Sequence, residues 1–564
     1  MIGIEGRNVL VLGGAGMVGT AVCRELAAHK PARIVIAARR QARARMTVEH
    51  LSAEHPEWAD RLVPVWGDVF LRGEWQGATD DTRGEVLADR EKRRRAVADI
   101  LDPVDEEILR SSLLFRMVMG LAPGLDGVCA EIVIDCINTA TAVSYQDVYS
   151  LARRLADRAD SVDADTDWPR EVETFIAALS VPQLVRHVQI LYAAMREART
   201  QAYLKVGTSG TGGMGFNIPY THGEEKPSRL LLSKAALAGA QTMLTFLMAR
   251  TPDAPPMVRE VKPTALIGWH KIVHGPIRSR GKEIPLFDCS PENAVSIKQI
   301  SNLAPQGDFG IATGDKLEGV YIDTGENGLF TADEFAAITT PGQMQLITPQ
   351  DVARTVVAEL LGGDTGRDII AALDSSVSGP SYRGGYLRQA ALTRLRQLEE
   401  QHGQAVAFEV LGPPRLSKIL YEAYLLKTVV GKVSTVVEMD PDELSGALER
   451  RVEEDPKLRR RILSIGIPIL LPDGARLLRG PVIKSDNSQS GWVDLTPENM
   501  RSWQIRLTEI RREFDAEPRS DTSSRGERIF AASREWGPCP EFFEPGEIAA
   551  WIFLREEGGR RAKP

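Results

Sequence analysis

Three glycines near the amino terminus have the spacing of a turn that binds a phosphate group. Gly13, Gly16 and Gly19 follow a short apolar run and overlap the start of a helical pattern from Met17 to His29. Glycine lets a backbone approach a ligand closely, and a helix start offers unpaired N–H groups and a partial positive charge. Since a second apolar run, Ile34 to Ala38, completes a strand–turn–helix–strand unit, the pattern predicts binding of a dinucleotide pyrophosphate. The predicted contacts are Gly13, Gly16, Met17, Val18 and Gly19.

Two arginines after the second run indicate which dinucleotide binds. In folds of this kind an acid at this point accepts from the 2′-hydroxyl of NAD, whereas an arginine suits the 2′-phosphate of NADP. The chain has Arg39 and Arg40 here and no acid nearby. We therefore predict NADP. NAD stays the alternative, because arginines also follow strands on ordinary protein surfaces.

Further apolar runs predict the strands that position the glycine turn. They alternate with helical patterns, which is typical of a doubly wound parallel α/β (Rossmann) sheet with right-handed crossovers. Two polar, helical stretches, at about 71–128 and 143–178, are longer than ordinary connections and are interpreted as insertions. The later runs are Arg61–Val65, Glu131–Cys136, Tyr203–Val206 and Met257–Val261, and the residues after them that we assign to the cofactor site are Asp68, Val69, Asn138 and Pro263.

A chain of 564 residues is too long for one hydrophobic core. We expect a nucleotide-binding domain over 1–270, a small substrate subdomain and return to the core over 271–380, and a mainly helical extension over 381–564. Thr331–Glu334 (T-A-D-E) has the pattern of a capping box, and Thr348-Pro349 of a helix start.

The composition limits the kinds of partner, metal and cellular location that we expect for this protein. The net charge of −8 argues against a general nucleic-acid binder. The five cysteines are scattered without a C-x-x-C pair, which fits a reducing cytoplasm and offers no zinc site, and we predict no metal. The first strand begins almost at Met1, so we expect no signal peptide. The most apolar segment, Leu230 to Ala249, contains Lys234 and Gln241, so we expect a buried helix and no membrane span.

The segment from Lys205 to Gln241 resembles the extended short-chain dehydrogenases/reductases, in which a serine-rich strand end precedes a loop and a Y-x-x-x-K helix. The glycine turn, Asp68, Asn138 and the run Val261–Gly268 occur in that family's order. The resemblance covers about 1–270, interrupted by the two insertions, and leaves 381–564 outside. It implies a nicotinamide cofactor and hydride transfer to or from a small-molecule carbonyl or alcohol.

The resemblance also implies a serine, a tyrosine and a lysine at the reacting carbon. Ser209 matches the serine that holds the substrate oxygen, and Lys234 matches the lysine that also holds the nicotinamide ribose. In the family, cationic neighbours lower the pKa of the tyrosine, which otherwise lies near 10, so that it can transfer a proton. Here Leu230 stands at the tyrosine's position, and leucine cannot transfer a proton.

Another residue must therefore supply the proton, or the site does different work. Tyr220, in the loop between Ser209 and Lys234, is the first candidate, followed by His222 and Glu224. His222 and His270 are candidates for substrate binding. Each could equally be an ordinary polar loop residue.

Three functions follow. The leading one is an NADP-dependent oxidoreductase. The second is a redox-neutral epimerase, dehydratase or lyase that uses bound NAD(P), and the third is a dinucleotide-binding scaffold without catalysis. The resemblance further implies a homodimer, since relatives pair the helices that correspond to 182–199 and 230–249 in a four-helix bundle. Helix 230–249 is apolar on nearly all sides and needs a cover; the C-terminal third is the alternative cover.

Overall fold

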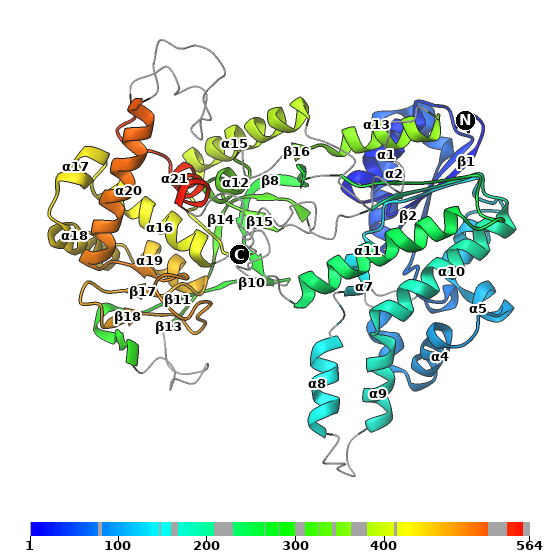
Figure 1. The fold of residues 1–564 in the computed structure, drawn as a ribbon, viewed down its shortest axis with the longest axis horizontal. Coiled ribbons are helices and arrows are strands. Elements are labelled where there is room, and N and C mark those ends of the chain that lie inside the picture. Colours follow the sequence, from blue (N-terminus) through cyan, green and yellow to red (C-terminus); the bar gives the residue numbers. More distant parts are fainter. Residues whose placement is uncertain are drawn as a thin grey trace. The chain divides into compact units, whose positions relative to one another are not determined.

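The computed structural model describes residues 2–76, 82–144, 146, 148–158, 167–207, 229–263, 265–279, 281–298, 311–325, 328–340, 346–362, 381–410, 414–516 and 539–556. The chain divides into two compact units (Figure 1). Unit 1 comprises Met1–Gly215, Pro227–Gly268 and Leu346–Gly384, and unit 2 comprises Phe216–Lys226, Trp269–Gln345 and Gly385–Pro564.

Unit 1 is built on a sheet of six parallel strands, as predicted. The spatial order is β3-β2-β1-β4-β5-β6, and every neighbouring pair is parallel. The order reverses between β1 and β4, and in such sheets a ligand binds beyond the carboxyl ends of the strands at this point. The strands are β1 (Asn8–Leu12), β2 (Arg33–Ala38), β3 (Leu62–Trp66), β4 (Ile132–Asp135), β5 (Ala202–Val206) and β6 (Met257–Val261).

Helices cover both faces of this sheet, because alternate side chains of the buried strands point to opposite faces. On one face Val9 and Val11 belong to a core shared with α1 (Met17–Ala27), α2 (Gln41–Glu54) and α13 (Pro349–Leu360). On the other face Leu10 and Leu12 pack with α6 (Leu113–Val118) and α10 (Ser180–Ala198). A short strand, β16 (Leu346–Ile347), pairs in parallel with β7 (Ala265–Leu266) just before α13.

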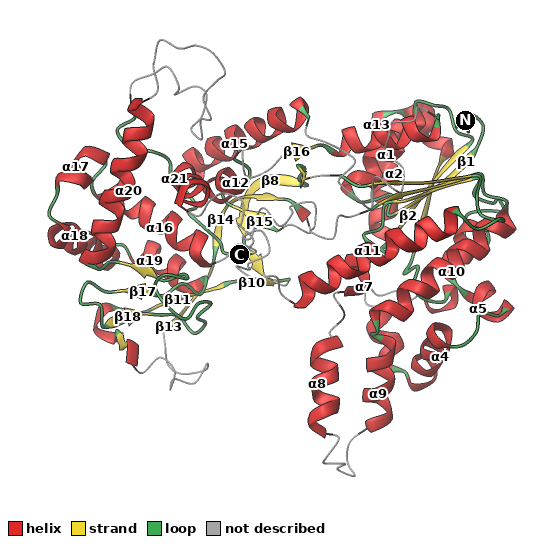
Figure 2. Cartoon of the chain, in the orientation of Figure 1, coloured by secondary structure: helices red, strands yellow, loops and turns green. Residues whose placement is uncertain are grey.

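The predicted insertions are helical, as the red ribbons in Figure 2 show. The first lies between β3 and β4, and the second precedes α10. Arg93 on the first forms an ion pair of 2.8 Å with Glu173 on the second, so the two insertions pack together. Their helices are α3 (Thr82–Ala88), α4 (Arg90–Leu101), α5 (Glu106–Ser111), α6, α8 (Val148–Arg158) and α9 (Trp168–Ala177), and the short α7 (Thr139–Ser144) leads from β4 into the second insertion.

Unit 2 combines small sheets with helices. Thr331 and Glu334 form the predicted capping box at α12 (Ala332–Ile338). The antiparallel strands β17 (Ile469–Leu470) and β18 (Arg476–Leu478) form a hairpin that turns at Pro472–Gly474. The other strands of unit 2 include β8 (Lys271–Pro276), β11 (Pro285–Asp288), β13 (Ile311–Lys316), β14 (Glu318–Asp323), β15 (Leu329–Phe330) and β19 (Val493–Asp494). Its longer helices include α16 (Pro414–Val429), α18 (Pro441–Glu454), α19 (Pro456–Ser464) and α20 (Pro497–Ala516), with the short α21 (Pro545–Trp551) near the end.

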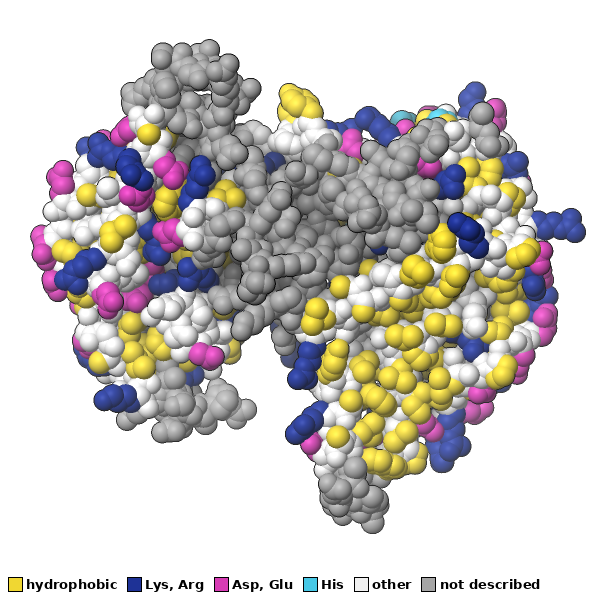
Figure 3. Space-filling view, in the orientation of Figure 1, with side chains coloured by type: hydrophobic (Ala, Val, Ile, Leu, Met, Phe, Trp, Pro, Cys, Tyr) yellow, Lys and Arg dark blue, Asp and Glu magenta, His cyan; other side chains and the backbone are white. Residues whose placement is uncertain are grey.

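An apolar surface lies over α10 and α11 (Arg229–Ala249), which pack side by side in unit 1 (Figure 3). On α11, Leu232, Met243 and Leu247 are 53%, 45% and 55% exposed, and on α10 Val181 is 58% exposed. The apolar helix predicted over 230–249 is therefore covered on one side by this chain and open on the other. Among the described helices none is by itself long and apolar enough to cross a membrane, although α9 and α10, a bent pair, pass that test jointly.

Candidate functional site

The glycine turn between β1 and α1 has a backbone that only glycine can form. Gly13 has φ +74°, in the left-handed region that favours glycine. A Cβ at Gly19 would lie 2.2 Å from the carbonyl oxygen of Gly13 and 2.7 Å from the Cα of Gly14. The first turn of α1 therefore packs directly on the turn that precedes it, and a side chain at position 19 would not fit there.

The start of α1 fits a pyrophosphate. Gly16 is the residue before the helix, and in the described chain no side chain caps the first turn. That turn also contains no acidic residue. Unpaired N–H groups and the helix dipole are thus available to an anion. Met17 lies beside Gly268, because a Cβ at Gly268 would be 3.3 Å from the Met17 sulfur.

The end of β2 leads directly into α2. Arg39 and Arg40 are both exposed there, and Arg40 is the residue that precedes the helix. Two cations at a helix start that is exposed at the carboxyl edge of the sheet would attract a phosphate group. Their assignment to the 2′-phosphate stays a prediction.

The end of β3 is joined to the first insertion. The carboxylate of Asp68 accepts a hydrogen bond from the backbone N–H of Phe70 (3.0 Å) and lies 3.3 Å from the guanidinium of Arg83 on α3. The side-chain carbonyl of Gln76 accepts from the N–H of Asp68 at 2.9 Å. Val69 is buried at 8% exposure. Asp68 and Val69, which are predicted to belong to the cofactor site, thus lie where the first insertion contacts the sheet.

The end of β4 is held by a buried lysine that sequence reasoning missed. Lys205 on β5 is 1% exposed, and its ammonium lies 3.0 Å from the carboxylate of Asp135, which is wholly buried. The same ammonium donates to the carbonyl of Ile137 (2.5 Å) and to the hydroxyl of Thr139 (3.4 Å). Lys205 therefore fixes the backbone on both sides of Asn138, a predicted cofactor residue.

A second buried acid, Glu260, extends the Asp135–Lys205 pair into a row of three charged residues across the sheet. Register pairs Asp135 with Lys205 and Lys205 with Glu260 on β6, so the three side chains share one face. Glu260 is 1% exposed, and burial raises the pKa of its carboxyl. The hydroxyl of Thr242 on α11 donates to it at 3.2 Å. A Cβ at Gly207 would lie 2.1 Å from the Glu260 carboxylate, so this acid sits at the carboxyl end of β5.

Of the remaining predicted residues, some lie in the described part of the chain and others lie outside it. Lys234 on α11 is buried at 5% exposure, and Pro263 follows β6. His270 is exposed and belongs to unit 2, where its backbone N–H donates to the carbonyl of Asp323. The residues that lie outside the described part of the chain are Ser209, Tyr220, His222 and Glu224, and the side chain of Leu230 does so too. Their catalytic and substrate roles stay predictions.

Two family models match separate parts of the chain. The NAD dependent epimerase/dehydratase family matches residues 9–86, which contain the glycine turn, Arg39, Arg40 and Asp68. A model described as the beta-methylindole-3-pyruvate reductase C-terminal domain matches residues 286–557. The search of curated proteins found no match.

Solved structures with some likeness to the chain include several reductases. A 3-oxoacyl-[acyl-carrier protein] reductase from Brucella melitensis is 15% identical, with 63% of this chain and 85% of that chain covered and a TM-score of 0.28. A short-chain dehydrogenase from Sphingobium yanoikuyae in complex with NADPH is 12% identical, with 46% and 72% covered and a TM-score of 0.24. Pen from Bacillus thuringiensis is 10% identical, covers 46% of this chain and has a TM-score of 0.23; this chain spans about half (51%) of its length.

Proposed function

We propose a function that starts from the family of unit 1, which is an NAD(P)-binding Rossmann unit of the extended short-chain dehydrogenase/reductase superfamily. The protein is an NAD(P)-dependent oxidoreductase. In our proposal its substrate is a 2-oxo acid with an aromatic substituent. The protein uses NADPH to reduce the ketone of this acid, which gives the 2-hydroxy acid. The observation that carries the proposal is that one chain joins the glycine-turn sheet to a segment matched by a 2-oxo acid reductase domain.

The substrate class comes from that second match. Beta-methylindole-3-pyruvate, the compound in the family's description, is a 2-oxo acid whose third carbon bears an indole ring. The matched residues, 286–557, make up most of unit 2, which in this proposal contributes the substrate-specific part. The same description supports reduction as the direction of the reaction.

The residues of unit 1 would act as follows. The glycine turn and the start of α1 bind the pyrophosphate, Arg39 and Arg40 bind the 2′-phosphate, and buried Lys234 orients the nicotinamide ribose. The bound cofactor supplies a hydride to the ketone carbon, and a proton must reach the ketone oxygen. Ser209 would hold that oxygen, with Tyr220 the first candidate proton donor.

The test is the absorbance of the reduced nicotinamide with purified full-length protein. We expect NADPH to be consumed when beta-methylindole-3-pyruvate is added, with one 2-hydroxy acid formed for each NADPH oxidised. Lys234→Met should abolish turnover, whereas Lys30→Met, at an exposed lysine of the same unit, should not change it. Unchanged NADPH with this acid and with its analogue lacking the methyl group would refute the proposed substrate class.

A redox-neutral reaction is the second candidate, because the family matched by residues 9–86 also contains epimerases and dehydratases. In that case the protein would convert its substrate with catalytic NAD(P) and no net change in the nicotinamide absorbance. Product analysis by mass and chirality, at a cofactor concentration far below that of the substrate, separates the two candidates.

We also propose that two copies of the chain pair through α10 and α11. The apolar side chains of Leu232, Met243 and Leu247 on α11 and Val181 on α10 are exposed on adjacent helices. A contiguous apolar surface of this kind marks an interaction site, and a second copy offers a matching apolar face. A cytoplasmic location is proposed because the five cysteines are scattered along the sequence and form no C-x-x-C pair.

A further inference from the structure

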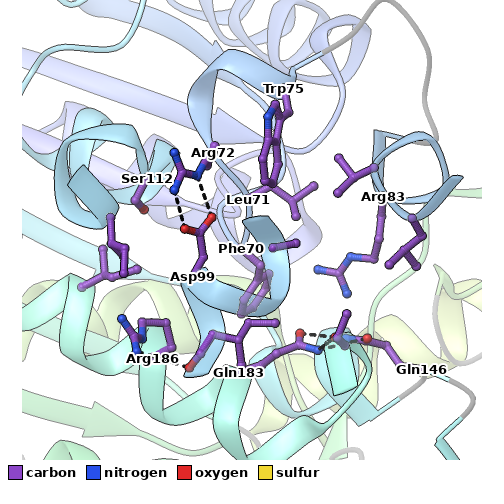
Figure 4. A pocket seen from close by; sticks show the side chains of 17 residues that line it. Phe70, Leu71, Arg72, Trp75, Arg83, Asp99, Ser112, Gln146, Gln183 and Arg186 are labelled. Atoms are coloured by element: carbon purple, nitrogen blue, oxygen red, sulfur yellow. Dashed lines mark hydrogen bonds and ion pairs between the residues drawn. The ribbon is translucent and has the colours of Figure 1, made fainter. Parts of the chain in front are cut away.

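Unit 1 contains a cavity that belongs to neither predicted site. It lies between α10 and the helical insertions, and its volume is about 60 Å³. A buried water needs at least roughly 10–15 Å³ on this measure, so the cavity has room for about four to six waters. Most of its wall is apolar, including Phe70, Trp75 and Ile190 (Figure 4).

Two arginines on this wall already have acidic partners. Arg72 binds both oxygens of Asp99, at 2.6 and 2.7 Å, and reaches Glu107 at 2.9 Å. These bonds, the one to Asp99 foremost, raise the pKa of its guanidinium. Arg83 lies 3.3 Å from Asp68. Figure 4 shows Arg72 beside Asp99 and Arg83 on another side of the cavity. The charges of both are compensated within the protein.

Arg186 differs from them. It lies on α10, is 8% exposed and has no carboxylate at ion-pair distance in the described chain. One of its terminal nitrogens donates to the backbone carbonyls of Ile100 and Asp102. Its Nε and Nη1 are buried without a hydrogen-bond partner among the described residues. Burial lowers the pKa of this guanidinium, and the charges of Asp99, Asp102 and Asp105 only partly offset that effect.

A buried cation with two N–H donors that lack a hydrogen-bond partner is energetically unfavourable unless an anion binds to it. The two N–H donors without a partner, Nε and Nη1, lie on different edges of the guanidinium, because the nitrogen that shares an edge with Nε is Nη2. Each of them can donate one hydrogen bond to an oxygen of an anion. Gln183, one turn earlier on α10, pairs its amide with that of Gln146 at 2.8 and 3.1 Å and so closes the wall beside Arg186. The cavity thus combines a buried cation, which has no carboxylate within ion-pair distance in the described chain, with an apolar interior.

We propose that this cavity binds a small organic carboxylate. The carboxylate would pair with Arg186, and its short apolar body would lie against Phe70 and Ile190. A monoanion would add one negative charge beside Arg186, whereas a dianionic phosphate would add two near Asp99, Asp102 and Asp105, whose charges already act on this guanidinium. The site is made by the insertions and α10, so it is a binding function that the insertions add to unit 1 and that does not depend on the proposed reductase activity.

The test is calorimetric titration of the full-length protein with sodium butyrate, whose six heavy atoms suit the cavity, and in parallel with inorganic phosphate. We expect one butyrate per chain and at least tenfold weaker binding of phosphate. Arg186→Met should weaken butyrate at least tenfold. It should still fold, because burying a charge that has no ion-pair partner costs solvation free energy that an apolar side chain of similar length does not cost.

A second variant tests the cavity itself. Ala96 lines it and is 6% exposed, so Ala96→Leu should fill the space and also weaken butyrate at least tenfold while Arg186 is intact. Arg90→Met, at an exposed arginine of the same helix, α4, is the matched control and should not change binding. The proposal would be overturned if the wild-type protein bound butyrate and both Arg186→Met and Ala96→Leu bound it as tightly. It would also be overturned if the wild-type protein bound no butyrate, or bound phosphate as tightly as butyrate.

Repeating the titration with saturating NADPH separates this site from the proposed function. Butyrate affinity should be unchanged, and Arg186→Met should bind NADPH as the wild type does. Displacement of butyrate by NADPH would overturn a separate site. If NADPH fails to bind at all while butyrate still binds, the proposed function fails and the carboxylate site stands.

Discussion

Replacing Lys205 by methionine tests whether the buried charged row holds β4 and β5 together. The substitution keeps a similar length but removes the ammonium that lies 3.0 Å from Asp135 and that donates to the carbonyl of Ile137. Asp135 would stay wholly buried, and its carboxylate would still accept hydrogen bonds from the hydroxyl of Tyr203 (3.2 Å) and the N–H of Ile137 (2.9 Å). Removing one partner of a buried ion pair costs about 3–5 kcal/mol, because the other charge is left uncompensated.

Hydrogen exchange read by mass spectrometry measures this loss locally, which matters because a chain of two units need not unfold in a single step. Since each 1.4 kcal/mol is a factor of ten, amides of β4 and β5 should exchange about two to three and a half orders of magnitude faster in Lys205→Met. Lys30→Met, at an exposed lysine of unit 1, should leave the exchange of these strands unchanged.

A double variant isolates the charge effect. Asp135→Asn combined with Lys205→Met removes both charges, and replacing a buried pair by neutral groups is often tolerated. We therefore expect β4 and β5 to be better protected in the double variant than in Lys205→Met alone. Less than a tenfold effect of Lys205→Met, or a double variant as weakly protected as the single one, would refute the assignment of the row as a stabilising pair.

Three further perturbations have expected outcomes. Arg39→Ala should weaken NADPH about tenfold to a hundredfold and leave NADH unchanged in calorimetry, since a hydrogen bond to a charged group contributes about 1.5–3 kcal/mol; equal losses for both would contradict the 2′-phosphate contact. Burial lowers the pKa of His187 from its ordinary 6.5 to about 4, so the folded state binds fewer protons than the unfolded state and unit 1 loses stability as pH falls from about 6.5 towards 4. His187→Leu should reduce that dependence in urea unfolding between pH 4.5 and 7, and an unchanged slope would count against it. Leu247→Glu should convert the proposed dimer to a monomer in light scattering, whereas a wild-type monomer would exclude the pairing through α10 and α11.

Local patterns predicted the elements whose causes are local. The glycine turn, the strand runs of unit 1 and the capping box at Thr331 depend on residues close together in the sequence, and the structure has each of them. The apolar character of helix 230–249 was also visible. Which of its sides stays open was not, because exposure of Leu232 and Leu247 depends on which elements pack against α11.

The charged row and the arginine cavity were decided by tertiary structure alone. In the sequence, the only sign of the charged row is that Lys205 and Glu260 interrupt apolar strands. A lysine in a strand is, however, as compatible with an exposed edge as with a buried ion pair. The parallel register of β4, β5 and β6 brings Asp135, Lys205 and Glu260 onto one face, although they are far apart along the chain. The sequence by itself therefore determined a dinucleotide-type sheet and its glycine turn, whereas strand pairing and insertion docking decided which charges lie buried beside it, since burial and pairing are properties of neighbours in space.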